Sequence, residues 1–202
     1  MGINTVDRYL TSYFGFPLIM NKNDNTEIDI GLKNFPDNLT SLIKESLDSK
    51  NSVKKIDARG KLVKMGKTIL PQLHRLLDTE NGLLREEAAK IVELIANRKS
   101  IPFLINLLDD NKFEIRWIGA EGLIKIGRRS ILPLLKSVRD GESSYFHNQG
   151  AHHVLNSLLN EYEKKKLSPL LLSLDDSHEL GETSPVEASE AIKTIFKRNN
   201  TV

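Results

Sequence analysis

The sequence predicts an all-α protein: an α-solenoid, wound as a right-handed superhelix, of four helix pairs with helical caps at both ends. Two sets of residues predict this fold, because each set recurs along the chain at nearly the same spacing. We call residues at equivalent positions of successive repeats a column. The alanines recur every 31 residues, and the prolines recur at intervals of 31, 31 and 36 residues. Two independent columns that share one period indicate a tandem repeat. The columns are Ala58, Ala89, Ala120 and Ala151, and Pro71, Pro102, Pro133 and Pro169.

Each half of the repeat has the pattern of a helix. After the first proline, Leu73, Leu76 and Leu77 follow the i, i+3, i+4 spacing that places an apolar stripe on one helix face. The proline itself falls in the first turn, where a missing N–H costs nothing and φ is already set. Around each alanine we expect a close helix crossing, which a small side chain permits. The glycines expected to serve the same crossings are Gly119, Gly122 and Gly150.

The parts outside the regular repeat differ in pattern. Residues 1–50 are predicted to form an N-terminal cap, with helices at 5–16 and 36–49 and a polar loop at 21–34 between them. The second of these helices is expected to open at Pro36 and Asp37 with a good cap. Residues 51–180 hold the repeats, and the fourth repeat carries five extra residues near 160–166. Residues 181–202 are predicted to form a C-terminal cap. In each pair we call the helix with the column alanine the first-type helix and the helix that begins near the column proline the second-type helix; residues 185–196 are predicted to start another first-type helix.

Composition narrows the classes of function. With 39% hydrophobic and 28% charged residues among 202, the chain has the composition of an ordinary folded protein. The lack of cysteine excludes disulfides, thiolate zinc sites and thiol nucleophiles. The sequence shows neither a signal peptide nor an apolar run of about 20 residues, so a cytoplasmic location is expected. The net charge of +2 indicates no partner by itself, so the placement of charge matters more than its sum.

Three segments, EIRWIGAEGLIKIG, ILPLLKS and GAHHVL, resemble the short HEAT-like repeats of bacteria, the class also found in phycobilisome lyases. The resemblance covers residues 53–176. It implies that the repeats serve mainly as interaction surfaces. We therefore expect a non-enzymatic scaffold with a protein partner and no cofactor.

Two enzyme classes share the HEAT-like architecture. Di-iron deoxyhypusine hydroxylases place His-Glu pairs in several repeats, whereas this chain has a single pair, His178 and Glu179, in a predicted loop. DNA glycosylases use a basic concave cleft with aromatic residues and a catalytic carboxylate, and no aromatic cluster or acid stands among the residues expected on this concave face. No phosphate-binding loop and no Ser/His/Asp arrangement is recognisable, so no catalytic residue is predicted. The concave residues are His74, Arg75, Asn106, Lys136 and Arg139.

Two adjacent histidines raise the question of a metal site. His152 follows the alanine column by one residue, where the other repeats carry polar residues, so we expect it to face solvent. His153 follows by two, in a tight and largely apolar column, which predicts a hydrogen-bonded histidine at a repeat interface. A helical zinc pair requires i, i+4 spacing, which neither these residues nor His147 provides. No metal ligand is therefore predicted.

Charges are segregated between two kinds of turn. Bases occupy the turns inside repeats and acids the turns between them, so stacking would create one basic edge and one acidic edge. One interpretation is local: the bases end one helix and the acids cap the next, each contributing about 0.3–1 kcal/mol through the helix dipole. The other is that the basic edge binds an acidic protein or a nucleic-acid backbone. The bases are Lys64, Lys67, Arg98, Lys99, Arg128, Arg129, Lys164, Lys165 and Lys166, and the acids are Asp78, Glu80, Asp109, Asp110, Asp140, Glu142, Asp175 and Asp176.

The single tryptophan completes the set of candidate binding residues. Trp117 stands in a polar column, where a large aromatic side chain either anchors a partner or covers the neighbouring repeat. Protein binding is the predicted function, and nucleic-acid binding through the basic edge or cleft, with or without glycosylase-like chemistry, is the alternative. The predicted binding residues are Trp117, Arg75, Asn106, Lys136, Arg139, Arg98, Lys99, Arg128 and Arg129.

Overall fold

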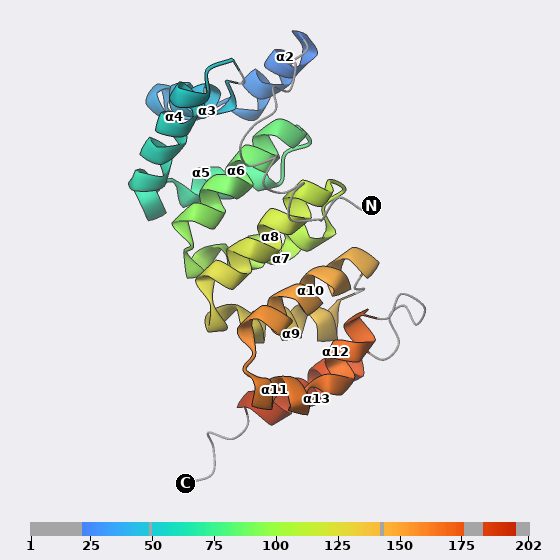
Figure 1. The fold of residues 1–202 in the computed structure, drawn as a ribbon. Coiled ribbons are helices and arrows are strands. Elements are labelled where there is room, and N and C mark those ends of the chain that lie inside the picture. The colour runs from blue at the N-terminus through green and yellow to red at the C-terminus, as the bar shows by residue number, and fades with distance from the viewer. Residues whose placement is uncertain (1–21, 49, 142–143, 176–183, 197–202) are drawn as a thin grey trace, which may run out of the picture. The chain divides into compact units, whose positions relative to one another are not determined.

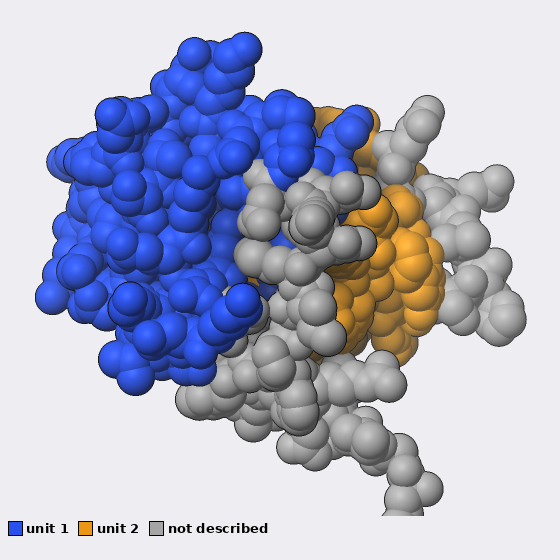
Figure 2. Space-filling view, turned by 90° about the horizontal axis from the view of Figure 1, so that it is seen from above, with its two compact units in different colours: residues 1–95 blue, residues 96–202 orange. Residues whose placement is uncertain are grey.

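The structure is a computed structural model that describes residues 22–48, 50–141, 144–175 and 184–196. All regular secondary structure in these ranges is helical, so the all-α fold predicted from the sequence is confirmed (Figure 1). The chain divides into two compact units, residues 1–95 and 96–202, which Figure 2 shows in blue and orange. The predicted helix at 5–16 lies outside the described residues.

Unit 1 contains the first predicted helix pair and the first helix of the second pair. Helix α3 packs against α4, and α5 packs against α6. The side chains of Asn51 and Asn81 cap α4 and α6 by accepting hydrogen bonds from main-chain N–H groups in the first turn. The helices of this unit are α2 (Lys22–Gly31), α3 (Asp37–Leu47), α4 (Ser52–Met65), the 3-10 helix η1 (Gly66–Ile69), α5 (Leu70–Leu77) and α6 (Gly82–Ile95).

The segment 21–34 was predicted to be a loop, and this prediction was wrong, because it contains α2. Ile28 and Leu32, four residues apart, lie on one face and are buried. Glu27 accepts a hydrogen bond from the side-chain amide of Asn81 at 3.1 Å, which links α2 to the turn before α6. Tertiary packing of two apolar residues thus overrides the weak helix propensity of this polar segment.

Helix α3 begins at Asp37, as predicted, but without the expected cap. Pro36 occupies the N-cap position and makes no side-chain hydrogen bond to the first turn. Proline has no side-chain acceptor for such a bond, so the capping prediction was wrong. The helix is held instead by its buried face, which includes Leu39 and Ile43.

Unit 2 contains the second helix of the second pair and the two following pairs. Helix α8 packs against α7 and α10, and α10 packs against α12. The five-residue insertion forms a short helix, α11, that opens with a capping box between Asn160 and Glu163. The helices are η2 (Arg98–Ser100), α7 (Ile101–Asn106), η3 (Leu107–Asp109), α8 (Phe113–Ile126), η4 (Arg128–Ser130), α9 (Ile131–Asp140), α10 (Tyr145–Leu158), α11 (Glu161–Lys166), α12 (Ser168–Asp175) and α13 (Ser184–Phe196).

The last helix, α13, buries Ala188 and Ala191, the two residues that predicted a restart of the repeat. Its main contacts are with α9 and α12. The next helix of the first type would instead stack on α10. Helix α13 therefore covers the second-type helices of unit 2 rather than continuing the first-type row.

The alanine and glycine columns mark tightly packed positions, as predicted. All four column alanines are buried. A Cβ added at Gly119 would lie 2.9 Å from the Leu107 Cβ and 3.0 Å from the Leu104 carbonyl oxygen, so α8 approaches the α7–η3 segment too closely for any larger residue. Gly60, by contrast, has open space around its position.

We predict that Gly119→Ala and Gly60→Ala change stability in opposite directions. Gly119→Ala should lower the free energy of unfolding by about 1–3 kcal/mol, because the neighbouring backbone must shift. Gly60→Ala should raise it by about 0.5–1 kcal/mol, because alanine favours a helix and meets no neighbour. Urea unfolding of both variants measures the difference, and an equal gain in both would contradict the close approach at Gly119.

Candidate functional site

Exposed aromatic side chains gather at the N-terminal halves of α8 and α10. Phe113, Tyr145 and Phe146 are 38%, 40% and 47% exposed. The Arg116 guanidinium contacts two of these rings, with its Cζ 3.9 Å from the Phe146 ring centroid and 5.7 Å from that of Phe113. We call Phe113, Arg116, Trp117, Tyr145 and Phe146 the aromatic patch.

Trp117 lies at the inner side of this patch and is half-buried. Its ring centroid is 4.7 Å from that of His153 on α10 and 6.2 Å from that of Phe113 on its own helix. The ring therefore covers the neighbouring repeat, which is one of the two roles that the sequence allowed. Trp117 thus contacts both Phe113 of the patch and His153 on the neighbouring helix.

The adjacent histidines differ in their contacts. His153 Nε2 lies 2.9 Å from Glu121 Oε1 on α8, so the predicted hydrogen bond at a repeat interface is confirmed. His152 was predicted to face solvent but is half-buried. The reason is that the polar column to which it belongs does not face solvent: its first two members, Arg59 and Lys90, are buried.

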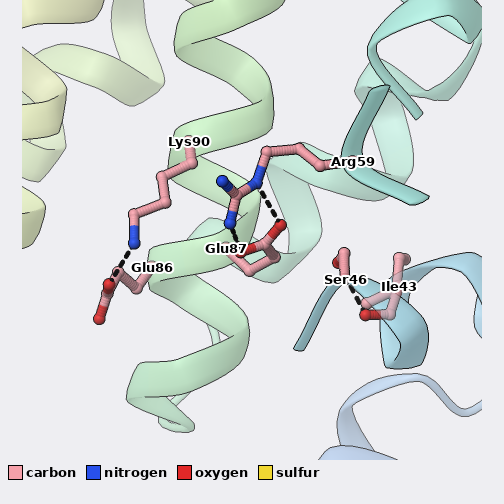
Figure 3. Close-up of polar contacts among 6 residues, drawn as sticks. All are labelled: Ile43, Ser46, Arg59, Glu86, Glu87 and Lys90. Carbon is pink, nitrogen blue, oxygen red and sulfur yellow. Dashed lines mark hydrogen bonds and ion pairs between the residues drawn. The ribbon is translucent and has the colours of Figure 1, made fainter. Parts of the chain in front are cut away.

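Ion pairs make this burial tolerable in unit 1 (Figure 3). Arg59 on α4 donates two hydrogen bonds to Glu87 on α6, with N···O distances of 2.7 and 2.6 Å. Lys90 pairs with Glu86 within α6 at 2.6 Å. A bidentate arginine–carboxylate pair satisfies both charges, which an isolated buried charge could not achieve. Burial lowers the pKa of nearby Lys55, and Glu87 opposes that shift.

The basic edge keeps only part of its charge available. Arg98, Lys99 and Arg129 are exposed in η2 and η4. Arg128 is also exposed, but its two terminal nitrogens donate to Glu163 of α11 at 2.9 and 2.5 Å, and one also donates to a main-chain carbonyl of α10. The sequence pattern missed Glu163 because this residue belongs to the insertion, which falls outside the 31-residue period.

The acidic turns serve two purposes. Asp110 accepts a hydrogen bond from the Lys112 N–H at 2.8 Å, but Lys112 is the N-cap residue of α8, so this bond closes the turn before the helix and does not cap its first turn. Asp109 instead reaches α10, where its Oδ2 lies 3.0 Å from His147 Nδ1. Neither contact is a helix cap, so the two contacts do not support the capping interpretation of these acids. Two of its members, Glu142 and Asp176, lie outside the described residues.

The predicted concave residues are only partly brought together. Asn106 and Lys136 line one cavity of about 310 Å³ in unit 2. Arg139 pairs with its neighbour Asp140, with 2.5 Å between Nε and Oδ1. Arg75 belongs to unit 1, where its Cζ lies 5.1 Å from the Phe35 ring centroid.

That cavity also contains acids, which the sequence pattern did not place on this face. Asp109 and Asp140 line it beside Lys136. Within the described ranges, no group of three or more histidine, aspartate or glutamate side chains could hold a metal ion. Nor does any helix there have the length and apolarity needed to cross a bilayer. The pair His178 and Glu179 lies outside these ranges.

Comparison with known proteins identifies the repeat. Residues 69–156 match the family model of HEAT repeats. This segment of the chain is therefore similar to HEAT repeats. The matched segment runs from the residue before α5 into α10, and so covers parts of all four predicted helix pairs. No curated protein matches the chain significantly.

The link between Arg128 and Glu163 predicts a shifted titration. The pKa of Glu163 lies below its ordinary value of 4.5, mainly because Arg128 donates hydrogen bonds to its carboxylate. A lowered folded-state pKa stabilises the fold at neutral pH, and this contribution is lost as the pH falls through the lowered value. Arg128→Ala should return the pKa of Glu163 toward 4.5 in an NMR titration of side-chain carboxyl groups. Arg129→Ala is the control, and a Glu163 pKa that does not respond to Arg128→Ala would contradict the link.

Proposed function

We propose that this HEAT-like repeat protein is a scaffold that binds a protein partner through the aromatic patch on α8 and α10. The observation that carries the proposal is the group of exposed rings around Arg116. The sequence resemblance supports a bacterial protein of the phycobilisome-lyase repeat type, and we also propose the cytoplasmic location that was expected from the sequence.

The chemistry of the patch supports protein binding. Aromatic residues and arginine are enriched at the centres of protein interfaces, where they supply much of the binding energy. Three partly exposed rings on two adjacent helices offer apolar area that gains roughly 25 cal/mol for each Å² removed from water.

Arg116 gives the patch a polar element of fixed position. One of its terminal nitrogens donates to the Asp110 carbonyl oxygen at 2.8 Å, and its guanidinium stacks on Phe146. An arginine held in this way loses little further entropy when it binds a carboxylate. The partner that fits is a protein segment that presents apolar side chains together with an acidic residue.

Nucleic-acid binding is the alternative function, and the ion pairs of two of the predicted binding arginines favour it less. Arg128 is engaged by Glu163, and Arg139 by Asp140. Each such pair reduces the positive charge available to phosphates, on which nucleic-acid affinity depends.

Removal of the patch should reduce partner recovery. We expect the double variant Phe113→Ser/Phe146→Ser to recover at least about tenfold less partner than the wild type in affinity purification from the native host, because hot-spot rings each contribute about 2 kcal/mol. Quantitative mass spectrometry of the bound proteins measures this loss. Leu172→Ser, which removes a side chain that is 71% exposed on α12, is the control and should retain the partner.

The same experiment distinguishes the alternative. Nuclease treatment should leave the recovered material unchanged. If nuclease removes it, and if Arg98→Glu/Lys99→Glu/Arg129→Glu abolishes recovery while the double patch variant does not, the protein binds nucleic acid and the scaffold proposal is wrong.

A further inference from the structure

Three side chains from three elements meet beside the cavity in unit 2. Ser137 Oγ on α9 lies 3.1 Å from Nε2 of His147 on α10. The other ring nitrogen, Nδ1, lies 3.0 Å from Oδ2 of Asp109 at the end of η3. All three residues line the 310 Å³ cavity. No Ser/His/Asp arrangement was recognisable in the sequence, because the three residues are separated along the chain and match no known motif spacing. The structure brings them together and so corrects that expectation.

The repeat itself does not require a histidine at position 147. His147 stands four residues before its column alanine, and the two preceding repeats carry Arg85 and Arg116 at the same position. Each arginine donates to a main-chain carbonyl of the turn that precedes its helix, at 2.7 and 2.8 Å. Arginine therefore performs the structural task of this column. Histidine replaces it only where a serine lies within hydrogen-bond distance.

Ser137 also has an internal counterpart. Ser137 and Ser173 both follow their column proline by four residues, and both hydroxyls can donate to the carbonyl oxygen three residues earlier, at 2.8 and 2.9 Å. The hydrogen bond from the serine hydroxyl to the carbonyl oxygen three residues earlier is thus common to both serines of this column. The contact with His147 distinguishes Ser137 from Ser173.

The remaining contacts suit a general base. His147 is 5% exposed, so its ring is held by its surroundings. Asp109 accepts a hydrogen bond from Ser144 on its Oδ1 while its Oδ2 faces His147 Nδ1. A carboxylate at Nδ1 favours the tautomer that carries its proton there, which leaves Nε2 without a proton. Nε2 can then accept the hydroxyl proton of Ser137 once that hydroxyl rotates away from the Leu134 carbonyl oxygen, to which it donates in this structure.

Two further polar side chains of the cavity are exposed and can donate hydrogen bonds. Asn106 carries an amide and Lys136 an ammonium group, and both line the cavity with Ser137. Donors of this kind stabilise the oxyanion that forms when a serine attacks a carbonyl carbon. Asp140, the second acid of the cavity, is paired with Arg139. The cavity is open to solvent, and its volume of about 310 Å³ has room for a small ester.

We propose that Ser137 is the nucleophile of an esterase-type site that accepts small carboxylic esters, with His147 as its general base and Asp109 as a positioning residue. In the first step, Ser137 Oγ forms a bond to the acyl carbon, and its proton passes to His147 Nε2. The ester C–O bond then breaks, and the leaving alkoxide takes that proton. In the second step, water attacks the acyl carbon and gives a proton to His147. The Ser137–acyl bond then breaks, Oγ takes the proton back, and the carboxylic acid is released.

A fluorophosphonate probe tests the nucleophile directly, because its phosphorus forms a bond to an activated serine with release of fluoride. Intact-mass measurement of the full chain should show one adduct, and peptide mapping should place it on Ser137. Ser137→Ala should abolish the adduct, and His147→Gln should slow its formation at least about 100-fold, which is the usual contribution of a general base. Ser173→Ala removes the counterpart serine and should react like the wild type.

A second variant separates chemistry from folding. His147→Arg restores the residue that the preceding repeats use, so it should keep the wild-type unfolding temperature and lose the adduct. Asp109→Asn should slow labelling and change its pH profile, as expected for a positioning residue. Hydrolysis of p-nitrophenyl acetate should follow the same order among the variants. A folded wild-type protein that takes no probe, labels Ser173 equally, or labels Ser137 at the same rate in His147→Arg would overturn the proposal.

Discussion

The packing of unit 2 depends on the close approach of α8 and α10 to the α7–η3 segment. At Gly119, Gly122 and Gly150, an added Cβ would lie within 3.0 Å of leucine atoms in that segment. Those leucines belong to the apolar stripe that the repeat period defines, so the contact ties the first-type helices to one register. The same register brings Phe113 and Phe146 to one surface, and it brings His147 next to the second-type helix that carries Ser137.

Polar contacts between repeats add specificity that the apolar stripe lacks. The leucine stripes of all repeats are similar, so they do not determine which repeat packs on which. Arg59 pairs with Glu87 across α4 and α6, and Glu121 pairs with His153 across α8 and α10. Such pairs satisfy each other only when the correct helices are neighbours, and loss of one partner of the buried pair would leave an uncompensated charge.

The sequence predicted what depends on local pattern. The period identified the helix pairs, the buried alanines and the hydrogen-bonded His153, because each follows from the helical spacing of residues close in sequence. The sequence pattern failed to predict features that depend on contacts between residues far apart in the chain. Helix α2 forms because Ile28 is buried by tertiary packing, and Glu163 contacts Arg128 from an insertion that breaks the period. The cavity is lined by residues from four helical elements. The polar column that includes Arg59 was misplaced because its ion pairs cannot be recognised from one repeat alone.

The helices approach closely at the small-residue column, and equilibrium unfolding of alanine-to-leucine variants tests this approach most directly. Ala89 and Ala120 are both buried, so leucine at either position should overpack the interface and lower the free energy of unfolding by about 1–3 kcal/mol. Leucine at Asn156, an exposed position on α10, should change stability by no more than about 0.5 kcal/mol. Equal or higher stability of the Ala89→Leu and Ala120→Leu variants would contradict this close approach and the register of the helices.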